Sequence, residues 1–143
     1  MQQVFVTFAP ETADARRTVD EVKAAFEGPE TAVKVKPASQ SSILDIEPAD
    51  LVLFGVGRTD ADVPPEYGEL VRVFAGCNLA GKAAAFFPLG ATRASAALRR
   101  SLKPTEISAL EEEPAPEKAG RGDVRGWALV VKEFLKGVRD GRR

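Results

Sequence analysis

Ala49-Asp50-Leu51-Val52-Leu53-Phe54-Gly55 is the stretch that decides the fold of this chain. It is too short for an ordinary helix and rich in residues that favour strands. Its apolar residues do not alternate with polar ones, so both faces of a strand built from them have to be covered. Gly55 and Gly57 end it. The stretch therefore predicts a central strand of a parallel sheet.

Four further stretches on either side are predicted to be strands. Residues 3–8 are β-branched and aromatic, and residues 83–87 form a second uninterrupted apolar run. Residues 31–36 alternate apolar with polar side chains and stop at Pro37, which is typical of an edge strand. Residues 105–110 make a fifth, more polar strand.

Helical patterns separate these strands. Apolar residues recur at spacings of three and four in residues 15–26, 66–75, 92–102 and 123–138, and residues 38–48 have room for one or two turns. Strands and helices therefore alternate along the chain. Right-handed crossovers then predict an α/β fold with three layers, α/β/α, around a five-stranded parallel sheet.

The length and composition indicate a single domain over residues 1–143, because 44% of the 143 residues are apolar and can form a substantial core. Residues 111–122 contain acidic residues and prolines but almost no large apolar side chain, so we expect a mobile loop there. Asp123 is expected to cap the last helix. Residues 140–143 are expected to form a disordered tail.

The charge balance excludes several partners. Twenty basic and 21 acidic residues leave a formal charge of -1, so we expect neither a nucleic-acid nor an anionic-membrane partner. No apolar stretch approaches the roughly 18 residues of a membrane span. A single cysteine and the lack of a signal-like N-terminus favour a cytoplasmic location. The sequence does not indicate an oligomeric state.

The chain contains no histidine, which removes hydrolytic triads and imidazole-based zinc sites. No acidic loop has the spacing of a calcium-binding hand, so no metal is expected. No catalytic constellation is present, and the sequence leaves open whether the chain is an enzyme. Cys77 and Trp127 are each predicted to serve packing.

Residues 4–7, 49–55 and 79–87 cover the predicted first, third and fourth strands along the chain, and residues 123–135 cover the last helix. In these stretches and in the order of its elements, the chain resembles a flavodoxin-like domain of the short-chain type over nearly the whole length. It implies the sheet order 2-1-3-4-5 and a ligand crevice at the carboxyl ends of the first, third and fourth strands.

In flavodoxins that crevice holds flavin mononucleotide (FMN), and three loops grip it. The first loop follows the pattern Ser/Thr-x-Thr-Gly-x-Thr and cradles the phosphate at a helix N-terminus. Here residues 9–14 retain Thr12 but lack the glycine. Pro10 has no amide donor, and Glu11 and Asp14 place carboxylates where the phosphate would lie.

The other two loops lack the rings that flank a flavin. Residues 56–62 contain no aromatic side chain, and residues 88–93 keep Gly90 without the acidic and tyrosine partners common in the family. The candidate crevice residues are Pro10, Glu11, Thr12, Ala13 and Asp14 after the first strand, Gly57, Arg58 and Thr59 after the third, and Leu89, Gly90, Thr92 and Arg93 after the fourth.

Two functions follow from these loops. The favoured one is a cofactor-free module that acts as an interaction or regulatory domain, with a protein as its partner. The alternative is an FMN-dependent electron carrier or small flavin oxidoreductase in which Arg58 or Arg93 replaces the missing phosphate donors. These arginines either share an anion or pair with acidic residues of the same loops, and pairing is favoured. The acidic residues are Glu11, Asp14, Asp60 and Asp62.

Overall fold

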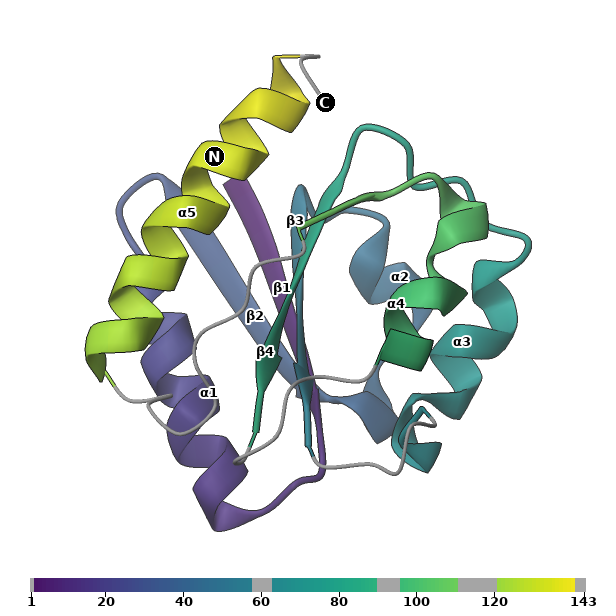
Figure 1. Ribbon diagram of the computed structural model, residues 1–143, viewed down its shortest axis with the longest axis horizontal. Helices are drawn as coiled ribbons and strands as arrows, with labels where there is room; N and C mark the ends of the chain where they lie inside the picture. The colour runs from purple at the N-terminus through teal and green to yellow at the C-terminus, as the bar shows by residue number, and fades with distance from the viewer. Residues whose placement is uncertain (1, 58–62, 90–95, 111–120, 141–143) are drawn as a thin grey trace.

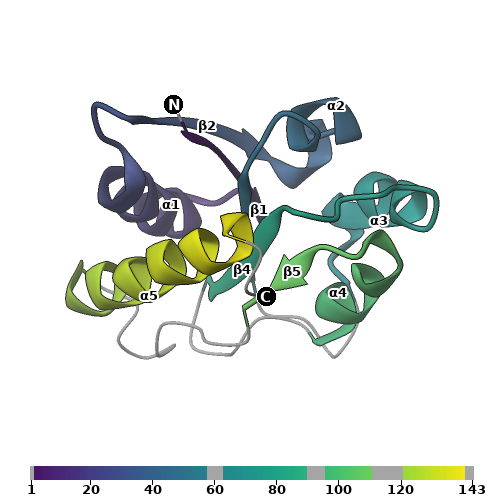
Figure 2. The same ribbon diagram turned by 90° about the horizontal axis from the view of Figure 1, so that it is seen from above.

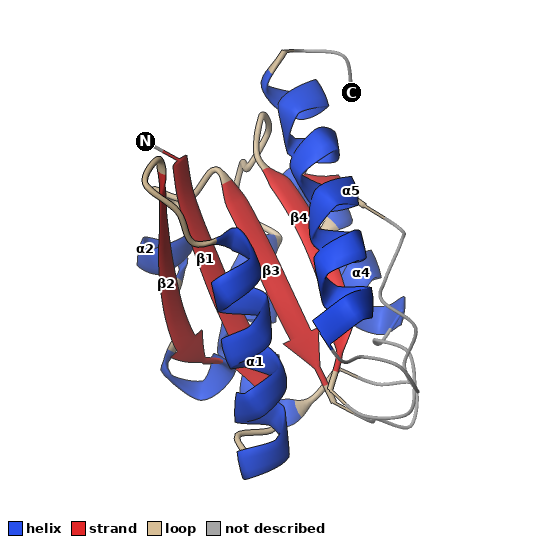
Figure 3. Cartoon of the chain, turned by 90° about the vertical axis from the view of Figure 1, so that its left-hand side faces the viewer, coloured by secondary structure: helices blue, strands red, loops and turns tan. Residues whose placement is uncertain are grey.

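The computed structural model describes residues 2–57, 63–89, 96–110 and 121–140, and within these ranges five parallel strands form one sheet in the order β2-β1-β3-β4-β5 (Figures 1 and 3). The strands are β1 (Gln2–Ala9), β2 (Thr31–Pro37), β3 (Leu51–Val56), β4 (Ala83–Pro88) and β5 (Ser108–Ala109). All the strand pairings are parallel. The predicted sheet order is confirmed.

Helices cover both faces of the sheet (Figure 2). Helices α1 (Ala13–Phe26) and α5 (Arg121–Arg139) pack on one face. The other face carries the remaining helical segments. These are η1 (Ala38–Gln40), α2 (Ile43–Ile46), η2 (Pro65–Tyr67), α3 (Gly68–Phe74), α4 (Ala96–Ser101) and η3 (Lys103–Thr105). The predicted three-layer α/β/α architecture is confirmed.

Strand β3 lies at the centre of the sheet, as its composition predicts. It pairs with β1 on one side and with β4 on the other, and all of its residues are buried. Leu51 and Leu53 face the core under α1 and α5, whereas Val52 and Phe54 face the opposite core. Strand β2 is a half-buried edge strand, which confirms the prediction from its alternating pattern.

The fifth strand is much shorter than the predicted 105–110, because Thr105 belongs to η3 instead. The Thr105 hydroxyl donates to the Leu102 carbonyl at 2.6 Å and accepts the Ile107 amide at 3.2 Å. Glu106 then adopts a left-handed conformation with φ of 64°. These local bonds leave only Ser108 and Ala109 extended along β4.

The helix boundaries also differ from the sequence prediction. The predicted helix 66–75 is a 3-10 turn followed by the short α3, because Pro65 opens a tight turn first. Helix α5 begins at Arg121, so the expected cap at Asp123 is wrong. Residues 121 and 122, which were predicted to end the loop 111–122, belong to this helix. Residues 92–95, 111–120 and 141–143 lie outside the described residues.

The packing roles predicted for two single residues are confirmed. Trp127 is 5% exposed, with its ring 6.1 Å from that of Phe26 and 5.8 Å from that of Phe87. Cys77 packs at the margin of the opposite core, and its thiol donates to the Val73 carbonyl at 3.0 Å. Among the described helices, none is long and apolar enough to cross a membrane.

Candidate functional site

The carboxyl ends of β1, β3 and β4 meet at one edge of the sheet, as the resemblance implies. Ala9 is in register with Val56, and Val56 with Pro88. Two backbone bonds continue this pairing into the loops, from the Gly57 amide to the Ala9 carbonyl at 2.7 Å and from the Leu89 amide to the Val56 carbonyl at 3.0 Å. The three candidate loops therefore begin side by side.

The structure places seven of the twelve candidate residues at this edge or directly after it. These are Pro10, Glu11, Thr12, Ala13, Asp14, Gly57 and Leu89. Arg58, Thr59, Gly90, Thr92 and Arg93 lie outside the described residues, as do Asp60 and Asp62. Whether the two arginines bind an anion or pair with those acidic residues therefore stays a prediction.

Pro10 packs directly against Gly57. A Cβ atom on Gly57 would lie 2.2 Å from Pro10 Cδ, closer than a side chain can approach, and would make a tight contact of 3.2 Å with the Ala9 carbonyl oxygen. Position 57 therefore requires glycine, because the loop after β1 comes too close to leave space for a side chain. This contact joins two of the three candidate loops, and nothing in the sequence of either loop identifies it.

Thr12 is the N-cap of α1. Its Oγ1 accepts the Ala15 amide at 3.1 Å, and its carbonyl accepts the Arg16 amide at 2.9 Å. An N-cap side chain satisfies one of the amides that a helix start leaves free. The hydroxyl retained from the phosphate-loop pattern is thus used within the helix itself.

Both acidic and basic side chains lie around the start of α1. Asp14 pairs with Arg17 rather than with a residue of another loop, and both side chains are exposed, so the pair adds little stability. Glu11 is exposed. The guanidinium of Arg16 lies 5.2 Å from the centre of the Phe8 ring. Asp14 complements the positive end of the helix dipole, which stabilises α1 and competes with any anion there.

Beneath the edge, Tyr67 joins the ends of β1 and β3. Its hydroxyl lies 2.7 Å from the Gly55 carbonyl and 3.0 Å from the Thr7 carbonyl, and the side chain is fully buried. Burial raises the pKa of the Tyr67 hydroxyl well above its ordinary value, which keeps the proton needed for donation. Tyr67 falls within the predicted helix 66–75, whose spacing does not reveal this link, although a buried tyrosine needs a partner for its hydroxyl.

A second buried polar link lies on the same face. Ser41 Oγ donates to the Pro37 carbonyl at 2.9 Å and lies 2.8 Å from Thr7 Oγ1. Because the Ser41 proton is used by Pro37, Thr7 donates to Ser41. The link ties the end of β2 to β1 and explains why a threonine interrupts the apolar side chains of β1.

We expect Tyr67→Phe to destabilise the protein by about 1 to 2 kcal/mol, because it leaves two buried carbonyls without their shared donor. The ring, and with it the apolar packing, is retained. Urea unfolding followed by far-ultraviolet circular dichroism measures the change. A loss below about 0.5 kcal/mol would show that this hydroxyl does not hold the two strand ends together.

Taken with the topology, this edge defines the class of structure: the chain has the flavodoxin fold. A short-chain flavodoxin associated with a non-canonical PDU bacterial microcompartment superimposes with a TM-score of 0.76 at 14% identity, covering 94% of this chain and 99% of the other. For Fusobacterium nucleatum flavodoxin bound to flavin mononucleotide the TM-score is 0.76 at 11% identity, with 94% and 99% covered. For oxidised flavodoxin 1 from Bacillus cereus the TM-score is 0.70 at 20% identity, covering 94% of this chain and 98% of the other.

Neither a protein-family model nor a curated protein sequence matches the chain. At the identities of the solved structures, the likeness establishes the fold and does not carry a ligand across to this chain.

Proposed function

We propose that this chain is a flavodoxin-fold domain that does not hold FMN in the usual flavodoxin manner and acts as an interaction or regulatory module for a protein partner in the cytoplasm. The observation that carries the proposal is the packing of Pro10 on Gly57. This contact brings together two loops that would otherwise grip a cofactor, with a residue that has no amide proton at the point where a phosphate needs donors.

Electrostatics support the same proposal. Glu11 and Asp14 flank the start of α1, where a phosphate in a flavodoxin would take the positive end of the helix. A carboxylate about 4 to 6 Å from a phosphate repels it by about 1 to 4 kcal/mol per charge pair at intermediate dielectric. The Thr12 hydroxyl accepts the Ala15 amide as the N-cap of α1, so its single proton is all that this side chain can donate to a phosphate.

The second candidate is an FMN-binding electron-transfer protein or a small flavin oxidoreductase with an atypical phosphate loop. It is favoured by the fold, since a neighbour with the same architecture is bound to flavin mononucleotide. In that case Arg58 or Arg93 would supply the charge that the first loop lacks. The two candidates differ in whether FMN fills the carboxyl edge.

Titration of FMN fluorescence with the purified protein tests the proposal. We expect colourless protein and no quenching of FMN at micromolar concentration. Replacing residues 9–14 by Ser-x-Thr-Gly-x-Thr removes two carboxylates and restores an amide cradle, so FMN affinity should rise about fivefold or more.

The double variant Glu11→Gln, Asp14→Asn is the control, because it removes the charges while leaving Pro10 in place. We expect it to recover only part of the gain. Isolation of the unmodified protein with stoichiometric FMN, or quenching at micromolar concentration, would establish the electron-transfer candidate instead.

A further inference from the structure

The outer side of helix α5 carries apolar side chains that the fold does not cover. Among the described residues, four large apolar side chains are exposed, and two of them, Leu129 and Val130, are neighbours on α5 with 65% and 38% of their surfaces exposed. The other two, Leu44 and Val73, lie on α2 and α3 in the opposite layer. Val131 is buried in the core beneath α5, so Leu129 lies on the side of the helix that faces away from the sheet.

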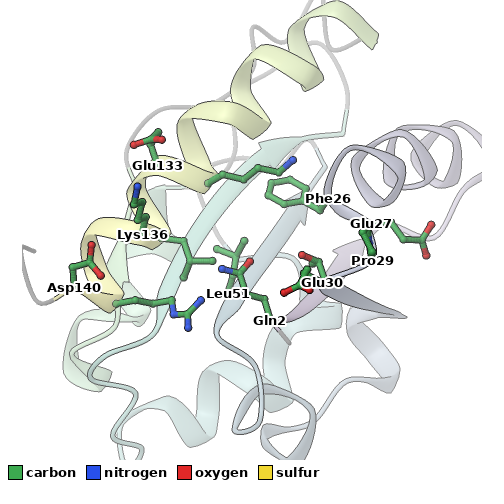
Figure 4. A pocket seen from close by; sticks show the side chains of 14 residues that line it. Gln2, Phe26, Glu27, Pro29, Glu30, Leu51, Glu133, Lys136 and Asp140 are labelled. Carbon is green, nitrogen blue, oxygen red and sulfur yellow. The ribbon is translucent and has the colours of Figure 1, made fainter.

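Two opposite charges lie about one turn on either side of Leu129. Arg125 precedes it by four residues and Glu133 follows it by four, so the three side chains lie along one face of α5. Both charged side chains are exposed. Figure 4 views the pocket between the turn after α1 and the end of α5, and it shows Glu133 at the rim, pointing away from Leu51. Arg125 and Glu133 are about 12 Å apart along the helix, farther than the spacing at which side chains of one helix pair.

The charged groups around these two residues do not neutralise them. Glu21 of α1 is half-buried and lines the same small pocket as Arg125, but no ion pair joins the two side chains. Lys136 follows Glu133 by three residues and forms no ion pair with it either. Lys132 is engaged elsewhere, because its Nζ donates to the Ala25 carbonyl of α1 at 3.0 Å. Within the described part of the chain, Arg125 and Glu133 are therefore available to a partner.

This face of α5 is complementary to itself. Along the helix the order is a cation, an apolar side chain and an anion, and an antiparallel copy of the helix presents the same groups in the reverse order. If a two-fold axis passes by Leu129, this residue meets Leu129 of the second copy. Each Arg125 then lies at the height of Glu133 of the other copy, because both are four residues from the axis. Such a contact is isologous and closes after two copies.

We propose that α5 is a self-association surface, on which a second copy of this chain packs its own α5 in the antiparallel direction. Contact between the copies removes apolar surface of Leu129 and Val130 from water, and two equivalent pairs of Arg125 with Glu133 fix the orientation. One helix from each copy buries less than the roughly 1,600 Å² of a standard interface, so we expect a weak dimer with a dissociation constant of about 10 to 100 µM.

Sedimentation equilibrium of the full chain between about 10 µM and 1 mM tests the proposal. We expect the average mass to rise with concentration from that of a monomer towards that of a dimer. Leu129→Ser should raise the dissociation constant at least tenfold, because it removes the apolar contact at the two-fold axis. Leu44→Ser is the matched control, since Leu44 is 74% exposed on α2 and lies away from this surface. Its dissociation constant should equal that of the unmodified protein.

A charge exchange tests the antiparallel alignment itself. Arg125→Glu and Glu133→Arg should each weaken the dimer at least tenfold, because like charges then meet across the axis. The double variant Arg125→Glu, Glu133→Arg should restore the dissociation constant to within about threefold of that of the unmodified protein. Arg100→Glu is the control for net charge, since Arg100 is exposed on α4, and it should leave association unchanged. Far-ultraviolet circular dichroism checks that each variant is folded.

The proposal is overturned if the protein stays monomeric up to about 1 mM, if Leu44→Ser weakens the dimer as much as Leu129→Ser, or if the double charge exchange does not restore association. It goes beyond the proposed function and does not rest on it. FMN quenching is measured at micromolar concentration and reports on the carboxyl edge of the sheet, so failure here leaves the proposed function untouched, and the reverse also holds.

Discussion

Gly55→Ala is expected to destabilise the protein by about 3 kcal/mol and to lower its melting temperature by about 10 °C. A Cβ atom at this position would lie 2.7 and 2.8 Å from two ring carbons of Phe87 and 3.0 Å from Phe8 Cβ. Both phenylalanines are 0% exposed, so neither has space into which it can move. Even one added methyl group therefore forces the central strand away from its neighbours.

Gly126→Ala makes the same chemical change as a control. Gly126 lies on α5, is exposed, and has no atom within 4 Å of an added Cβ. Alanine is favoured over glycine inside helices by about 0.5 to 1 kcal/mol, so this variant should be more stable than the parent. Urea unfolding of both variants measures the difference. Equal and small effects at the two positions would contradict the packing described around Gly55.

Asp45→Asn is expected to destabilise the protein by about 2 to 3 kcal/mol at pH 7. The Asp45 side chain is 5% exposed and accepts bonds from Lys34 at 2.6 Å, Lys36 at 3.3 Å and the Ser42 amide at 3.0 Å. Burial alone raises the pKa of this carboxyl, but these three donors outweigh it and lower the pKa from 3.8 to about 2.

The effect of this substitution depends on pH in a defined direction. Because the pKa is lower in the folded state, the unfolded chain binds the proton first, and the charge of Asp45 stabilises the fold fully only above about pH 5. That stabilisation is lost as the pH falls from about 4 to about 2. The two proteins should therefore differ most at neutral pH and converge near pH 2.

Unfolding in urea at pH 7, 4 and 3 checks this convergence. Asp20→Asn is the matched control, because Asp20 is an exposed carboxylate on α1. It should change stability by less than about 0.5 kcal/mol. A difference between Asp45→Asn and the parent that stays constant down to pH 3 would exclude the charge of Asp45 as its cause.

The sheet could be predicted from the sequence because burial on two faces leaves a strong compositional signal. Leu51, Val52, Leu53 and Phe54 have no polar neighbour among them, and β2 alternates as an edge strand does. The extent of the last strand, β5, was less predictable. Thr105 has a side chain that competes with the backbone for hydrogen bonds, and the 3-10 turn that it stabilises shortens β5.

The candidate site was predictable as a place but not as a set of contacts. Parallel strands bring their carboxyl ends together by topology, which identified the edge. The contact of Pro10 with Gly57 and the bonds of Tyr67 depend on distances between residues far apart in the sequence.

Gly55 also protects the chain against a folding error. The odd and even residues of β3 are equally apolar, so hydrophobicity alone would tolerate the strand sliding by one position and exchanging its two faces. After such a slide, a bulky neighbour such as Phe54 would lie in the narrow gap between Phe8 and Phe87. The missing side chain at position 55 therefore favours one alignment of the central strand, in which the Phe87 ring and Phe8 Cβ lie against Gly55.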